Sequence, residues 1–403
     1  MLGSIALALC VTAHGAPKYK VVHAFTGTDG SGPWGGVALD RKGNLYGTTA
    51  SGGTGTCGLY NCGVVFRVTP HGNGNWTETV LYDFVGGNDG AIPYDSVILD
   101  ASANIYGTNT KGGAHEAGTA FELTPNSGGW AFNTIFAFCP KIGKSGCEDG
   151  GGTQTGLTLD QSGNLYGPKS GGGGYAGAVF ELSSGSGGWD ETILYAFGMK
   201  TDDGAGPHAD LIFDAAGNLY GTTEFGGEYN GGTIYEIKRT ASNWSGYVLH
   251  SFAVNYKDGH KPGWGALLMD GSGNLYGTTA GGGCCGGVVY RLAPMANGEW
   301  KETILYEFQG GAEGFESNAG VVMDKAGNLY GTTDYGGSGD CGVIFKLAPQ
   351  SKGKWKYTVL HAFEGADGCF PEGNLVLDKK GNLYGGTVLG GATGNGVIFE
   401  LTP

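Results

Sequence analysis

The chain has 403 residues, of which 84 are glycine and 13 are proline, and its formal net charge at pH 7 is −14. So much glycine can indicate disorder, but aromatic residues make up 12% of the chain, far more than a chain without a packed core carries. The negative charge argues against nucleic acid and against an anionic membrane surface as partners, because both would repel the protein.

The chain begins with a segment that is typical of an export signal. Leu2 to Val11 is an apolar run too short to span a bilayer, and small residues with a candidate cleavage point follow at Ala13-His14-Gly15. A basic stretch ahead of the apolar run is missing, so the true start of the signal stays open. We expect residues 1–15 to be a signal peptide and residues 16–403 to form one domain, secreted or held at the cell surface.

One short phrase then recurs through the whole chain. Its first copy is Gly43-Asn44-Leu45-Tyr46-Gly47-Thr48-Thr49, in which Gly-Asn favours a turn and the next residues alternate from face to face as in a strand. Its tyrosine returns at steps of 54 to 60 residues, at Tyr46, Tyr106, Tyr166, Tyr220, Tyr276, Tyr330 and Tyr384. A fixed period of this size predicts repeats that stack on one another.

The order of segments within a repeat is clearest in the fifth copy. A short strand is predicted at Gly265–Asp270, and a turn leads from it into the tyrosine strand. A glycine loop at residues 281–287 then leads to a strand at Val288–Leu292, and Trp300–Phe308 forms the last strand. No helical period interrupts this order after the signal, so each repeat is predicted to be a meander of four antiparallel strands.

The ends of the chain predict how the repeats close. Antiparallel units in tandem leave long exposed edges unless the array forms a ring, which a β-propeller does. The chain opens with an isolated fourth strand at Lys18–Phe25 and finishes on a third strand at Gly396–Leu401, and together these complete one blade. The sequence therefore predicts an all-β, seven-bladed β-propeller, closed by the N-terminal outer strand pairing with the C-terminal strands.

Four phrases characterise the repeat: Gly-Asn-Leu-Tyr-Gly-Thr-Thr, a downstream Gly-Gly, Val-Phe-x-Leu-Thr-Pro, and Leu-x-x-Phe followed by Asp-Gly. They resemble the GloVer tandem-repeat family, and the resemblance covers all seven repeats. It implies a secreted or surface protein, because the members are predicted to be such proteins and carry different C-terminal anchors. It implies no particular activity, and the mode of surface anchoring stays open.

The cysteines suggest disulfides. Nine become eight if Cys10 leaves with the signal, and an even number in an exported protein favours pairing. Three pairs lie close in sequence or in neighbouring repeats: Cys57 with Cys62, Cys139 with Cys147, and Cys341 with Cys369. Cys284 and Cys285 remain, and a bridge between them would be strained because adjacent Cα atoms are only about 3.8 Å apart. Whether these two bridge or stay free is left open.

A ring of variable residues marks the candidate binding site. In each blade the link from the fourth strand to the first and the link from the second to the third open on the same face, which carries the eight cysteines. The position six before each first-strand aspartate lies at the central channel: Trp34, Tyr94, Gln154, His208, Trp264, Asn318 and Glu372. Aromatic and hydrogen-bonding groups together suit sugar rings and their hydroxyls. In the alternative interpretation, Trp34 and Trp264 only pack between blades.

Two other recurrent features are expected to be structural. One tryptophan begins the outer strand of most repeats: Trp76, Trp130, Trp189, Trp244, Trp300 and Trp355. Asp-Gly pairs suited to tight turns recur at Asp29-Gly30, Asp89-Gly90, Asp149-Gly150, Asp203-Gly204, Asp258-Gly259 and Asp367-Gly368. No cofactor is expected, and a calcium ion bound by one of these loops is the alternative.

Candidate catalytic residues gather in the fourth repeat and its neighbours. His208 and Asp210 precede the first strand of that repeat, and Glu224 follows its second strand. Asp334 fills the place of Glu224 two repeats later, and Glu372 borders the channel. Carboxylates with a histidine can act as general acid and base in cleaving a polysaccharide, by hydrolysis or by elimination.

The preferred function is a non-catalytic binding module for a glycan or a surface protein. The alternatives are a polysaccharide-degrading hydrolase or lyase on the same scaffold, and a purely structural surface protein. No Gly-x-Ser-x-Gly, His-Glu-x-x-His or phosphate-loop motif occurs in the sequence. We further expect a monomer with no nucleic-acid partner and no integral membrane span.

Overall fold

The computed structural model of the chain describes residues 15–58, 61–140, 142–143, 146–147, 151–171, 176–240, 243–253, 258–262 and 264–403. The expected signal peptide therefore lies outside the described residues except for Gly15. The Asp149-Gly150 pair lies outside them as well.

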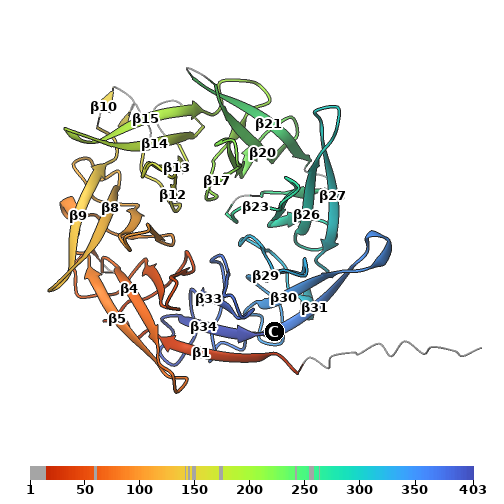
Figure 1. The fold of residues 1–403 in the computed structure, drawn as a ribbon. Helices are drawn as coiled ribbons and strands as arrows, with labels where there is room; N and C mark the ends of the chain where they lie inside the picture. Colours follow the sequence, from red (N-terminus) through yellow and green to blue (C-terminus); the bar gives the residue numbers. More distant parts are fainter. Residues whose placement is uncertain are drawn as a thin grey trace, which may run out of the picture.

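Seven four-stranded antiparallel sheets form a closed ring, the predicted seven-bladed β-propeller (Figure 1). Blade 1 consists of β2 (Ala38–Leu39), β3 (Leu45–Thr49), β4 (Val64–Pro70) and β5 (Trp76–Asp83). Blade 2 consists of β6 (Ile98–Leu99), β7 (Ile105–Asn109), β8 (Thr119–Asn126) and β9 (Gly129–Ala137). Blade 3 consists of β12 (Thr158–Leu159), β13 (Leu165–Lys169), β14 (Ala178–Gly185) and β15 (Gly188–Ala196). Blade 4 consists of β17 (Ile212–Phe213), β18 (Leu219–Thr223), β20 (Asn230–Arg239) and β21 (Trp244–Ala253).

The remaining blades repeat this order. Blade 5 consists of β23 (Leu268–Met269), β24 (Leu275–Thr278), β26 (Val288–Pro294) and β27 (Trp300–Glu307). Blade 6 consists of β28 (Val322–Met323), β29 (Leu329–Thr333), β30 (Val343–Pro349) and β31 (Trp355–Ala362). Blade 7 consists of β32 (Val376–Leu377), β33 (Leu383–Thr387), β34 (Val397–Thr402) and β1 (Lys18–Ala24).

Short elements decorate the loops. Three two-stranded ribbons pair β10 (Ile142–Gly143) with β11 (Gly146–Cys147), β16 (Gly204–Ala205) with β19 (Phe225–Gly226), and β22 (Gly259–His260) with β25 (Gly281–Gly282). The described helices are the 3-10 turns η2 (Gly87–Asp89), η3 (Gly311–Glu313) and η4 (Ser351–Gly353). Among the described residues, no helix combines the length and apolar character needed to cross a bilayer.

The ring closes as predicted. Strand β1 pairs antiparallel with β34, from Lys18 opposite Thr402 to Ala24 opposite Val397. In Figure 1, β1 in red therefore lies beside β34 in blue, and the first and last strands complete one sheet. This closure removes the two free edges that an open array would leave.

The innermost strand is shorter than predicted. In blade 5 it covers only Leu268–Met269, whereas the sequence pattern predicted Gly265–Asp270. The residues before it abut the next blade instead of pairing within their own: a Cβ added to Gly265 would lie 2.4 Å from the backbone nitrogen of Gly320. Contact between blades at the channel thus replaces strand pairing at this point.

The turn before each second strand is held by an aspartate. In blade 1, Asp40 Oδ1 accepts hydrogen bonds from the N–H of Lys42 at 2.8 Å and of Asn44 at 2.9 Å. Its Oδ2 accepts from Asn44 Nδ2 at 2.7 Å and from the Tyr46 hydroxyl at 3.3 Å. The tyrosine-to-aspartate bond recurs in all seven blades at 3.0–3.5 Å. The repeated phrase is therefore a hydrogen-bonded turn and not only a strand.

The same tyrosines pack between blades. Tyr46 is buried in a cluster with Ile105, Phe121 and Leu123 of blade 2, and Trp130 covers this cluster. The other five outer-strand tryptophans pack at the corresponding junctions, as expected for structural residues. Six of the seven junctions thus have an apolar core that includes a tryptophan, and the core between blades 6 and 7 consists of tyrosine, phenylalanine and aliphatic side chains.

In one of the aspartate-held turns an alanine occupies a left-handed backbone conformation that favours glycine. Six of the seven repeats have glycine ahead of the asparagine, with φ between 79° and 92°, whereas blade 2 has Ala103 at φ 66°. A Cβ in the left-handed region costs about 1–2 kcal/mol. Ala103→Gly should therefore raise the free energy of unfolding by about 0.5–1 kcal/mol, after the larger entropy of glycine in the unfolded chain is counted.

Urea unfolding of Ala103→Gly against the unsubstituted protein measures this gain. The matched control is Ala101→Gly in the same turn, because Ala101 is not among the described residues with positive φ. This control should give no gain. An equal gain from both substitutions would contradict the backbone explanation.

Candidate functional site

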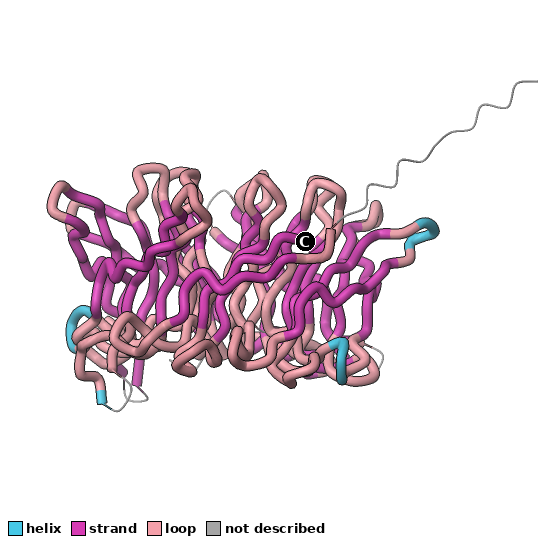
Figure 2. Tube along the Cα trace, turned by 90° about the horizontal axis from the view of Figure 1, so that it is seen from below, coloured by secondary structure: helices cyan, strands magenta, loops and turns pink. Residues whose placement is uncertain are grey.

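The face predicted to bind is built from two loops of each blade. Seen from the side, the strands run between two loop-covered faces (Figure 2). In several blades the loop after the fourth strand pairs with the loop between the second and third strands, as at Ser31 with Ser51 and Phe315 with Tyr335. Both loops therefore open on the same face of the ring.

Disulfides lie on this face. The structure contains Cys57–Cys62, Cys139–Cys147 and Cys341–Cys369, which are the pairs that the spacing favoured. Cys284 and Cys285, whose state the sequence left open, are free and exposed. The Cys284 thiol donates a hydrogen bond to the carbonyl oxygen of Phe308 at 3.4 Å.

The ring of variable residues meets at the channel. The ribbon leaves an opening at the centre (Figure 1), and side chains from the blades partly fill it. Six of the seven residues line one pocket there: Trp34, Tyr94, Gln154, Trp264, Asn318 and Glu372. The seventh, His208, stacks on Trp264 with ring centres 4.5 Å apart. All seven side chains are half-buried, so each keeps part of its surface open.

The aromatic members contact one another in one row, with two stacked pairs joined by a tilted contact between Tyr94 and Trp264. Trp34 of blade 1 stacks on Tyr94 of blade 2 at 4.8 Å, and Tyr94 contacts Trp264 of blade 5 at 6.3 Å. The rings therefore reach across the channel as well as between neighbouring blades. The hollow beside them offers only about 40 Å³ to the centres of water molecules, so a larger ligand would lie against the mouth instead of inside it.

Acidic groups border the row on one side. Burial raises the pKa of Glu372 to about 7. Burial and the nearby charge of Glu372 hold the pKa of Asp334 well above its usual range, and Asn318 Nδ2 donates a hydrogen bond to Asp334. These carboxyls therefore carry protons at a higher pH than exposed ones do.

On another side of the channel, His208 Nε2 lies 3.7 Å from Glu224 Oε2, and Lys261 Nζ lies 3.8 Å from Glu224 Oε1. Burial lowers the pKa of His208 to about 4, so its imidazole is neutral near pH 7. Burial also raises the pKa of Glu224, although the charge of Lys261 works in the opposite direction.

A pair of carboxyls adjoins the pocket at the channel, and one of them, Asp95, lines it. The N–H of Gly156 in blade 3 donates to Asp95 Oδ2 at 2.9 Å and to Asp210 Oδ1 at 2.8 Å, and the two carboxyls also hydrogen-bond to each other. Burial and the neighbouring Asp210 hold the pKa of Asp95 well above its usual range. Burial raises the pKa of Asp210 to about 6. Two like charges so close cannot both form without cost, so the pair retains a proton at mildly acidic pH.

The five candidate catalytic residues thus fall into three local groups. His208 lies with Glu224, Asp334 lies with Glu372, and Asp210 pairs with Asp95. Sequence reasoning missed Asp95. A signal was present, because the equivalent residue is small in the other repeats: Gly35, Thr155, Ala209, Gly265, Ala319 and Gly373.

Comparisons with known proteins place the repeat in a family. The sequence matches the family described as the Gloeobacter/Verrucomicrobia repeat over residues 10–212 and 211–403, as the repeat phrases suggested. Among curated proteins, none matches the sequence.

Several solved structures are similar in fold. A putative 6-phosphogluconolactonase from Bacteroides uniformis is 14% identical with a TM-score of 0.49, covering 83% of this chain and 87% of its own. A gluconolactonase from Xanthomonas campestris is 10% identical with a TM-score of 0.43, covering 96% and 89%. A putative oxidoreductase (glucose dehydrogenase) from Thermus thermophilus is 12% identical with a TM-score of 0.43, covering 96% and 100%.

The carboxyl pair predicts a pH dependence of stability. The pKa of Asp210 is raised to about 6 in the folded protein, against about 3.9 in an unfolded chain. Between these values the folded state binds more protons, so the free energy of unfolding falls as pH rises from about 4 to about 6. Asp210→Asn keeps an oxygen that can accept from Gly156 and removes the charge. Over this pH range, the free energy of unfolding of this variant should fall by on the order of 1 kcal/mol less than that of the unsubstituted protein.

Urea unfolding at several pH values from about 4 to about 8 measures the effect. Asp202→Asn, at an exposed carboxylate in the same repeat, serves as the control and should keep the pH dependence of the unsubstituted protein. If Asp210→Asn kept it too, the carboxyl pair would not be the cause.

Proposed function

The chain belongs to the Gloeobacter/Verrucomicrobia repeat family, and from this premise we propose that it is a secreted or cell-surface β-propeller that binds a glycan without cleaving it. The ligand lies against the channel mouth on the disulfide-bearing face. Residues 1–15 direct export, and the three disulfides suit an oxidising compartment. The mature protein, residues 16–403, acts as a monomer.

One observation carries this proposal: the row of Trp34, Tyr94, Trp264 and His208 lies beside hydrogen-bonding groups at the mouth of the channel. Aromatic faces pack on the apolar face of a sugar ring, while amide and carboxyl groups bond its hydroxyls. The small hollow favours a ligand that rests on the mouth, as an extended polysaccharide does. A surface protein is the other ligand class that such a face suits.

A polysaccharide-degrading enzyme is the second candidate. The Asp95–Asp210 pair favours it, because carboxyls that share a proton can supply both an acid and a base. Asp95 lines the same small hollow as the aromatic rings, and this hollow has little room for a polymer. We therefore rank binding first.

A retention assay on a panel of insoluble polysaccharides tests the proposal. The oxidised protein should be retained on at least one of them, with no oligosaccharide released into the supernatant by mass spectrometry. Trp34→Ala and Trp264→Ala should each weaken retention about tenfold, because each removes one stacking face. Trp34→Phe, which keeps a ring, should weaken it less.

Tyr247→Ala is the matched control, because Tyr247 is an aromatic residue 50% exposed on the outer strand β21. It should leave retention unchanged. Released oligosaccharides would overturn the binding proposal in favour of the enzyme, and loss of release in His208→Ala or Glu224→Gln would then locate the reaction. Retention on no polysaccharide would reject the glycan and point to a protein ligand or a structural role.

A further inference from the structure

Six of the seven junctions between blades share one arrangement of side chains. A histidine or tyrosine near the end of the fourth strand lies beside the acid of the following turn and faces one residue from the fourth strand of the next blade, whereas blade 2 has Phe136 in the first place. At three junctions the third residue is aromatic and stacks on the first: Tyr82 on Phe132 at 3.9 Å, Tyr306 on Tyr357 at 4.2 Å, and His361 on Tyr19 at 3.7 Å. There the acid accepts a hydrogen bond from the first residue, or bonds to its ring nitrogen.

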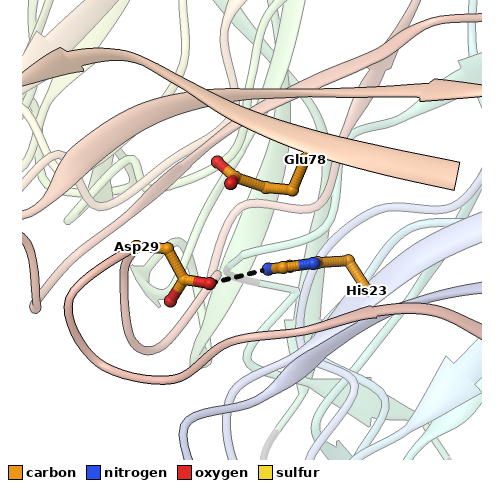
Figure 3. A group of neighbouring side chains, drawn as sticks. All are labelled: His23, Asp29 and Glu78. Carbon is orange, nitrogen blue, oxygen red and sulfur yellow. Dashed lines mark hydrogen bonds and ion pairs between the residues drawn. The ribbon is translucent and has the colours of Figure 1, made fainter.

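At two other junctions a glutamate lies beside a histidine and an aspartate, in the place of the aromatic ring. The remaining two junctions carry Glu191, which forms an ion pair with Lys169, and Gly246 in this place. Between blades 7 and 1, His23 and Asp29 meet Glu78 of β5, and the three side chains converge from separate segments (Figure 3). Between blades 4 and 5, His250 and Asp258 meet Glu302 of β27. In each triplet the ligand atoms lie within 4.8 Å of one another.

Stacking does not explain these glutamates. Glu78 Oε1 and Glu302 Oε1 are both shielded from solvent. Glu78 Oε1 accepts no hydrogen bond from a described residue, whereas the Glu302 carboxyl shares a hydrogen bond with the Asp258 carboxyl. Among the described residues, neither glutamate forms an ion pair with lysine or arginine. Each triplet thus places two carboxyls together in a half-buried site.

We propose that each triplet binds one divalent transition-metal cation, with Zn²⁺ as the representative ion. Two ligands about 2.1 Å from a tetrahedral Zn²⁺ lie about 3.4 Å apart. The observed separations are 3.2 Å from His23 Nε2 to Asp29 Oδ2, and 3.8 and 3.6 Å from His250 Nε2 to Asp258 Oδ2 and Glu302 Oε2. Small side-chain movements therefore suffice to bind the ion.

The ligand types select this class of ion. An imidazole nitrogen with carboxylate oxygens suits zinc and its first-row neighbours, whereas calcium takes oxygen ligands alone. The calcium ion considered for the Asp-Gly loops is therefore not the ion we propose, although Asp29 and Asp258 belong to two of those loops.

A bound ion would tie neighbouring blades together. Two ligands of the first site belong to β1 and the turn after it, and the third belongs to β5 of blade 1. Strand β1 is also the strand that closes the ring. Metal binding would then stabilise the closed ring, because only the folded protein presents all three ligands.

The test counts the zinc bound by untagged, metal-free protein in a Cys284→Ser/Cys285→Ser background, because the two exposed thiols would otherwise bind zinc themselves. Isothermal titration and elemental analysis after dialysis should both give two Zn²⁺ per chain. Glu78→Tyr and Glu302→Tyr should each leave one, and the double variant none. Tyrosine is the matched replacement, because Tyr19 stacks on His361 in the same position.

Stability supplies a second readout. Zinc should raise the melting temperature of the parent protein but not that of the double variant, and calcium should change neither melting temperature. If a tyrosine variant fails to fold, Glu78→Gln and Glu302→Gln keep the shape and should weaken binding at each site at least tenfold. The proposal is overturned if the parent protein binds no zinc at micromolar concentrations, or if the double variant binds as much as the parent.

Discussion

The fold depends on one hydrogen-bonded turn, in which an aspartate carboxylate holds the backbone of its own turn and the hydroxyl of a tyrosine two residues beyond the asparagine. The carboxylate fixes the tyrosine, and the tyrosine ring then packs into the next blade. Local turn geometry is thereby coupled to contact between blades. Because the same coupling recurs in every blade, small differences between repeats elsewhere do not disturb the ring.

The sequence differences between repeats are concentrated at residues that take no part in the held turn or in the packing of its tyrosine. The residues at the channel mouth follow the fourth strand and precede the held turn, so their side chains can differ without changing the packing between blades. Trp34, Gln154 and Glu372 occupy equivalent places and have unrelated chemistry. A repetitive scaffold of this kind presents a non-repetitive surface at its axis, which is where the candidate ligand site lies.

Much of this could be predicted from the sequence. The closed ring could be predicted because the period and the strand order are local patterns that repeat, and because the isolated first strand completes the last blade. The residues at the channel mouth could also be predicted, because each lies six positions before the aspartate that recurs in every repeat. The Asp95–Asp210 pair and the glutamate junctions could not be predicted, since they join side chains from different blades whose directions no local pattern gives. The state of Cys284 and Cys285 likewise needed the surrounding backbone.

The pairing of β1 with β34 also determines how the ring responds to force. Lys18 lies opposite Thr402, so the two ends of the folded chain leave the same sheet side by side. A force that pulls these two ends apart would act across the strands at one end of the pair. It would therefore break the hydrogen bonds between β1 and β34 one after another, and not all of them together. The propeller is therefore mechanically weak between its ends, whereas a load applied through a single end and the ligand face would pass through the junctions around the ring.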